Sequence, residues 1–104
     1  MTNEFGVKLD RNGYAPSVID ETKVCFLCKK RGDLARHEVF HGANRQKSKA
    51  YGAWVHLCPK CHQELHGKDP EIDKCLHTKG QIKVMEHYGW SVDDFRERFG
   101  KNYV

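Results

Sequence analysis

The residues best able to do chemistry in this 104-residue chain are cysteines and histidines in two short stretches. Cys25 and Cys28 are separated by two residues, and Cys58 and Cys61 repeat that spacing further along the chain. Two thiolates at this spacing on a tight turn can bind one ion together, and two such turns can close a tetrahedral site. We therefore predict a structural zinc ion bound by all four cysteines.

Two histidines follow the second cysteine pair. His62 and His66 stand four positions apart, so on a helix they lie on one face and point the same way. The four cysteines already complete a zinc site and leave both imidazoles for another ligand. The spacing therefore indicates a second, separate divalent ion beside the structural zinc. The alternative is that one histidine completes the zinc site while the other is a surface residue.

An ionisable pair, His37 and Glu38, lies in a strand-like segment at residues 33–40. Neighbouring side chains on a strand point to opposite faces. The pair indicates a site, although Glu38 could instead be an ordinary strand carboxylate paired with Arg36. A second strand, rich in aromatic and β-branched residues, is expected at 53–58. Proline at position 59 then favours the start of the helix that carries the two histidines.

Residues 41–52, between the expected strands, read as a polar loop with room for a helical turn. A polar loop of this length inside a small domain is often functional. The net charge of +4 is modest and fits a nucleic-acid partner. The cations that we expect to contact nucleic-acid phosphates are Arg45, Lys47, Lys49, Lys29, Lys30 and Arg31.

The remainder of the chain reads as two helices. An aspartate and a proline at 69–70 supply an N-cap and a first helical residue, and the helix can run to about residue 87. Ser91 caps a shorter helix that ends near residue 100. We expect His77 on the helix surface and Cys75 as a half-buried free thiol. The candidate buried positions of the longer helix are Ile72, Leu76, Ile82, Val84, Met85 and Tyr88.

With 104 residues and 38% hydrophobic content, the chain is expected to form one small domain that needs a metal staple. Its expected parts are an N-terminal arm (1–23), a core with both cysteine pairs (24–68) and C-terminal helices (69–104). No apolar run is long enough to span a membrane and no signal peptide is recognisable. We therefore expect a cytoplasmic protein with reduced thiols. The expected core residues are Val39, Phe40, Val55, Leu57 and Leu65.

Strand, polar loop, strand and metal-binding helix make a ββα unit, and over about residues 24–68 the chain resembles the HNH, or ββα-metal, endonucleases. The resemblance lies in the two cysteine pairs, residues 36–40, residues 57–62 and His66. The whole chain also looks like small HNH proteins of bacteriophages and prophages of Gram-positive bacteria. The implied fold class is α+β: a small ββα-metal core stapled by the four-cysteine zinc, with a helical C-terminal extension. The residues that carry the closer likeness are 37–42, Asn44, Arg45, Ser48 and 99–103.

The resemblance implies that His37, His62 and His66 bind a catalytic divalent ion, which could be Mg²⁺, Mn²⁺, Ni²⁺ or Zn²⁺. HNH enzymes place a general base, usually histidine, directly after the strand ligand, and Glu38 stands there. A free glutamate has a pKa near 4.3 and is a weak base at neutral pH. Burial could raise that pKa, Glu38 could be a ligand, or His41 could serve as the base.

The family's asparagine normally precedes the second cysteine pair by a few residues, near Ala53, and is missing here. Asn44 or His56 could take its place in space. This departure and Glu38 favour a catalytically degenerate zinc module. Retention of His37 with both helix histidines favours an enzyme, because a pure zinc module has no need of three further ligands.

Two functions are therefore expected. The first is a phage-encoded, metal-dependent DNA endonuclease or nickase, active in the cytoplasm of the bacterial host, that holds DNA mainly through its phosphates and has no membrane partner. The second is an HNH-fold zinc module that binds nucleic acid or a phage or host protein, for example as a host-defence inhibitor.

Overall fold

The protein is described by a computed structural model, which covers residues 1–67 and 70–104 and leaves out the side chain of His66. The described residues form a small α+β fold with one two-stranded sheet, one 3₁₀ helix and four α-helices. No helix among the described residues has the length and apolar content needed to cross a membrane. In chain order the elements are β1 (Ala35–Glu38), η1 (Gly42–Asn44), α1 (Arg45–Ala50), β2 (Trp54–Leu57), α2 (Pro59–Gly67), α3 (Pro70–Tyr88) and α4 (Val92–Phe99).

The two strands pair antiparallel, with Ala35 opposite Leu57 and Glu38 opposite Trp54. Both strands were expected, at slightly greater lengths. The segment between them is mostly helical rather than a loop, because η1 and α1 occupy it. The buried side chain of Ser48 explains why α1 packs against the ends of the two strands. Its hydroxyl donates to the Ala53 carbonyl at 2.6 Å and accepts from a backbone N–H of residue 40 at 3.1 Å.

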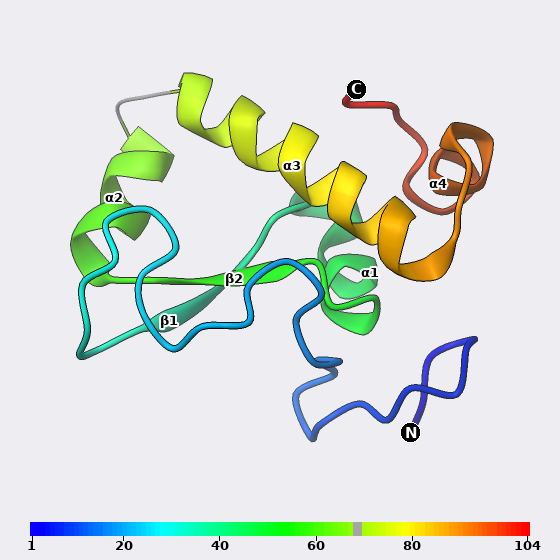
Figure 1. The fold of residues 1–104 in the computed structure, drawn as a ribbon, viewed down its shortest axis with the longest axis horizontal. Coiled ribbons are helices and arrows are strands. Elements are labelled where there is room, and N and C mark those ends of the chain that lie inside the picture. Colours follow the sequence, from blue (N-terminus) through cyan, green and yellow to red (C-terminus); the bar gives the residue numbers. More distant parts are fainter. Residues whose placement is uncertain (68–69) are drawn as a thin grey trace.

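Helix α3 lies across the sheet and α1 in Figure 1 and contacts the sheet side most closely at Gly80. A Cβ at that position would lie 2.8 Å from Val39 Cγ1, so only glycine permits the approach. The stripe of α3 that faces the core is Leu76, Gly80, Gln81 and Val84. The expectation that Ile82 is buried was wrong, since it is 39% exposed on the other face.

Helix α4 begins and ends as the sequence predicts. Ser91 and Asp94 form a capping box, and Gly100 ends the helix in the left-handed conformation at φ 76°. Phe95 and Phe99 are buried against Phe40, with ring centroids 5.3 and 4.9 Å from it. The predicted core is confirmed: Val39, Phe40, Val55, Leu57 and Leu65 are all buried.

The N-terminal arm packs against β2 and also reaches the end of α3, where Phe5 stacks on Tyr88 with ring centroids 4.9 Å apart. The indole of Trp54 donates to the Ala15 carbonyl at 2.7 Å, and Ser17 donates to the Trp54 carbonyl at 2.5 Å. Buried Asp20 accepts from the backbone N–H of His56 at 2.9 Å. These bonds fix strand β2 from outside, so the arm supports the sheet.

Candidate metal centre and histidine cavity

The four cysteines predicted to share a zinc ion lie together. Their sulfur atoms are all within 4.8 Å of one another, and Cys28 Sγ lies 3.8 Å from Cys58 Sγ. Cys25, Cys58 and Cys61 are buried and Cys28 is exposed. The first pair is held against the sheet by a hydrogen bond from the backbone N–H of residue 26 to the His56 carbonyl, at 2.7 Å. This cluster could hold a metal ion such as zinc.

Electrostatics around the cluster also suit a cation. Burial opposes ionisation of the Cys25 thiol, but backbone N–H groups of Cys28, Cys58 and Leu27 outweigh it and lower the pKa to about 6. Burial and the three neighbouring sulfurs raise the pKa of Cys61. Thiolates packed this closely repel one another, and a divalent ion would relieve that repulsion.

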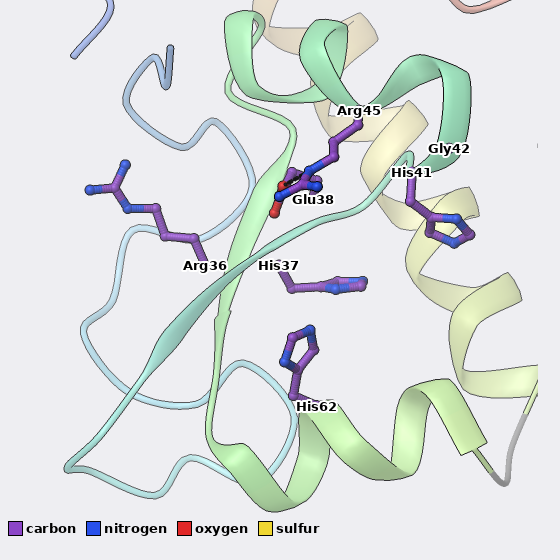
Figure 2. A pocket seen from close by; sticks show the side chains of 7 residues that line it. All are labelled: Arg36, His37, Glu38, His41, Gly42, Arg45 and His62. Carbon is purple, nitrogen blue, oxygen red and sulfur yellow. Dashed lines mark hydrogen bonds and ion pairs between the residues drawn. The ribbon is translucent and has the colours of Figure 1, made fainter. Parts of the chain in front are cut away.

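Beside the cluster lies a cavity of about 450 Å³ into which two histidines point. His37, at the end of β1, and His62, in the first turns of α2, face each other across it (Figure 2). Their ring centroids are 5.3 Å apart and the ring planes are inclined by 71°. His37 is 3% exposed. The residues that line the cavity are Arg36, His37, Glu38, His41, Gly42, Arg45 and His62.

The third predicted ligand of this site, His66, lies in α2, but its side chain is outside the described residues. The structure thus brings together two of the three histidines assigned to the catalytic ion. His62 belongs to an element directly joined to the cysteine cluster, because α2 begins between Cys58 and Cys61.

Glu38 is tied to Arg45 and not to Arg36. Its carboxylate accepts a hydrogen bond from Arg45 Nε at 2.7 Å, whereas Arg36 pairs with Asp10 at 2.6 Å. Burial tends to raise the pKa of Glu38, but the bond from Arg45, with a smaller contribution from Tyr14, lowers it below the usual value. The charged form is therefore favoured, which makes Glu38 in this arrangement a weak proton acceptor.

His41 borders the cavity from the segment between β1 and η1 and turns toward α3 (Figure 2). Its Nε2 lies 3.3 Å from Asp73 Oδ2, and Asp73 Oδ1 lies 3.6 Å from His77 Nε2. Sequence reasoning missed Asp73 and took His77 for a surface residue, whereas the His77 side chain is 15% exposed. The signal was present: Asp73 and His77 stand four residues apart on a helix.

The two candidates for the missing asparagine lie elsewhere. Asn44 donates to the Phe99 carbonyl at 2.8 Å and holds η1 to α4. His56 lies 3.2 Å from Asp20, on the side of the sheet covered by the N-terminal arm. Neither lines the cavity, so neither occupies the position proposed for it.

The predicted phosphate-binding cations divide into engaged and exposed groups. Arg45 holds Glu38, Lys47 donates to the Arg98 carbonyl at 2.5 Å, and the Lys49 ammonium lies 4.9 Å from the Tyr14 ring centroid. Lys29 donates to the carbonyl of residue 26 at 3.0 Å. A separate concavity near the start of α2 is lined by Lys30, Arg31 and Lys60 among others.

Comparisons of this chain with protein-family models, with curated proteins and with solved structures found no match. What stands established is a small α+β fold, a two-stranded sheet and a four-cysteine cluster that could bind a metal ion.

Proposed function

We propose that the protein is a metal-dependent DNA endonuclease or nickase with an HNH-like ββα-metal core. The observation that carries the proposal is the facing pair His37 and His62 in a cavity next to the four-cysteine cluster. A structural zinc would hold the hairpin to α2, and the histidine pair would present a second ion beside it. Divalent Mg²⁺, Mn²⁺, Ni²⁺ and Zn²⁺ are the candidate ions, and imidazole ligands favour the last three.

The donor set of the cavity fits such an ion. His37 and His62 would hold it, together with His66 if that side chain turns to the same face. Bound there, a divalent ion would polarise a scissile phosphate and stabilise the leaving oxygen. Imidazole ligands are neutral, so they leave the charge of the ion available to the phosphate.

The protein's own charges would position the DNA. Arg45 lines the cavity, and its guanidinium group suits phosphate oxygens. The Arg36 guanidinium points away from the histidine pair and is paired with Asp10 (Figure 2). A phosphate that takes Arg45 would release the Glu38 carboxylate from its ion pair. Two groups remain alternatives for the base, Glu38 and His41, and each is held by a partner in the structure, Arg45 and Asp73.

The test is nicking of supercoiled plasmid by the wild type with Mg²⁺, Mn²⁺, Ni²⁺ or Zn²⁺. His37→Ala and His62→Ala should abolish nicking and keep the structural zinc, because the two metals use different ligands. If Glu38 is the base, Glu38→Gln should lower the rate by roughly two to four orders of magnitude. If His41 is the base, His41→Ala should show that loss and Glu38→Gln a mild one. His87→Ala, at an exposed position of α3, is the matched control.

A second candidate function is a zinc module that binds nucleic acid or a protein without cutting. It is favoured by one observation, the ion pair that keeps Glu38 charged and occupied by Arg45. A wild type that is silent with every ion, while His62→Ala still binds its partner normally, would replace the enzyme proposal with this one.

DNA binding itself is tested through its dependence on salt. Lys30 and Arg31 are exposed and line the same concavity as Lys60, at the start of α2. Each phosphate contact contributes about 0.9 to the slope of log affinity against log salt. Replacing Lys30 and Arg31 by alanine should therefore lower the slope by about 2. Lys83→Ala, at an exposed lysine of α3, is the control. If the double variant and this control have equal slopes, the concavity does not contact DNA.

A further inference from the structure

The three side chains His41, Asp73 and His77 form a group at the rim of the histidine cavity, and of the three only His41 also lines that cavity. We propose that they bind a transition-metal ion of their own, of the zinc class. One ligand atom from each lies within 4.8 Å of the others. His41 comes from the segment after β1, and the other two lie one turn apart on α3, so the ion would join α3 to the rim of the cavity.

The separations in this group match a single small ion. Zinc takes nitrogen and carboxylate ligands at about 2.0–2.2 Å, which places neighbouring donors of a tetrahedron about 3.3–3.6 Å apart. His41 Nε2 lies 3.3 Å from Asp73 Oδ2, and His77 Nε2 lies 3.6 Å from Asp73 Oδ1. These two distances use different oxygens of the Asp73 carboxylate, and one ligand atom of each residue lies within 4.8 Å of the others, so modest side-chain movement would bring all three to one ion.

Unsatisfied polar atoms point to the same conclusion independently. His77 Nε2 and Asp73 Oδ1 are buried, and neither has a hydrogen-bond partner among the described residues. Their mutual distance of 3.6 Å is too long for a hydrogen bond. Buried polar atoms without partners are rare because leaving them so costs free energy. An ion between them would satisfy both atoms at once.

The His77 ring is already oriented as a ligand. Burial lowers the pKa of His77, and the nearby backbone of Val39 raises it, as a carbonyl that faces a ring nitrogen would. A carbonyl that accepted from Nδ1 would leave the lone pair of Nε2 to an ion, and Nε2 lies 3.6 Å from Asp73 Oδ1. A backbone carbonyl that accepts from the second ring nitrogen is the usual support of a metal-binding histidine. Stacking on Phe40, with centroids 5.6 Å apart and planes inclined by 19°, holds the ring further.

The group is open on one side. The His41 side chain is 50% exposed, whereas those of Asp73 and His77 are 26% and 15% exposed. An ion can therefore enter from solvent past His41 and keep a position for water. A His41 that binds the ion through Nε2 has only Nδ1 left to accept a proton, so the ligand role would compete with a role as base in the proposed nuclease.

The experiment titrates Co²⁺ into the full chain after its cysteine cluster has been filled with Zn²⁺. Wild type should bind Co²⁺ with ligand-field bands but without thiolate charge-transfer bands. Asp73→Asn, His41→Ala and His77→Phe should each bind one equivalent fewer than wild type. The phenylalanine keeps the ring contact with Phe40 and removes only the nitrogens. Glu86→Gln and His87→Ala, both exposed on α3, are the matched controls and should bind as wild type does.

The titration must also distinguish Co²⁺ bound at this site from Co²⁺ bound by the nearby pair His37 and His62. The double variant His62→Ala/Asp73→Asn should bind one equivalent of Co²⁺ fewer than His62→Ala alone, because the two sites share no ligand. The proposal is overturned if Asp73→Asn and His77→Phe, shown folded by circular dichroism, bind as many equivalents as wild type. It is also overturned if wild type takes no Co²⁺ beyond the cysteine cluster, or if the equivalent lost with Asp73→Asn is already lost in His62→Ala. None of these results depends on DNA cleavage.

Discussion

The cysteine cluster and the histidine groups are adjacent, but they are built in different ways. The cluster takes two ligands from each of two short turns, and three of its four residues are buried. The histidines around the cavity come from single positions on β1, α2 and the segment after β1, and one of them, His41, meets the Asp73 carboxylate of α3. One centre is closed and made of a single ligand type, and the other is open and mixed.

That difference assigns stabilisation of the fold to the cysteine cluster and chemistry to the histidine cavity. A closed four-thiolate site has no coordination position left for substrate, so its contribution is to folding. An open site of imidazoles and carboxylates contributes little to the fold and can exchange ligands. We therefore expect substitutions in the cluster to unfold the domain, and substitutions in the cavity to leave it folded.

The largest expected effect comes from Cys58→Ala. Structural zinc supplies about 10 kcal/mol of folding free energy in zinc-finger peptides at neutral pH. Loss of one buried ligand should therefore unfold the protein, as should a strong chelator on the wild type. Circular dichroism with elemental analysis measures both, with His62→Ala as the folded, zinc-containing control. A wild type that is folded without metal would contradict the division between the two regions.

A smaller effect is expected from Glu38→Gln, which weakens the bond from Arg45 to the Glu38 carboxylate. The Arg45 side chain is 61% exposed, so solvent screens the pair, and the free energy of unfolding at pH 7 should fall by about 1 kcal/mol or less. The folded-state pKa of Glu38 is lowered. Its contribution is therefore complete above the unfolded pKa of about 4.3 and is lost as the pH falls through the folded value.

Denaturant unfolding of both proteins between pH 7 and pH 3 checks this prediction. The two stabilities should differ by a constant amount down to about pH 4.5 and converge below it. A difference that grows as the pH falls would show that Glu38 is protonated in the folded protein and available as an acid.

The smallest effect is expected from Cys75→Ser. Cys75 and Cys28 are both exposed, but only Cys28 belongs to the cluster. Surface substitutions usually change stability by less than about 0.5 kcal/mol, so Cys75→Ser should keep its zinc and its melting temperature. Cys28→Ser should lose affinity for zinc and melt lower. Equal zinc content and equal melting temperature in the two variants would mean that exposure, and not membership of the cluster, decides how much a cysteine contributes to stability.

The sequence by itself determined the features that depend on local spacing. Two pairs of cysteines with a two-residue gap indicated the cluster, proline 59 marked the start of α2, and Ser91 with Gly100 marked the ends of α4. Local rules suffice because each of these features is set by residues within one or two turns of backbone.

Tertiary structure alone decided the rest. The polar segment 41–52 contains η1 and α1 because one inward serine bonds to the strand ends, which no apolar periodicity reveals. On α3 the buried stripe passes through Gly80, where close approach to Val39 requires the absence of a side chain, and Ile82 faces outward. The partners of Glu38, and the meeting of His41 with Asp73, join positions on different elements. Such contacts depend on how helices and strands pack, and a single sequence carries no local signal for them.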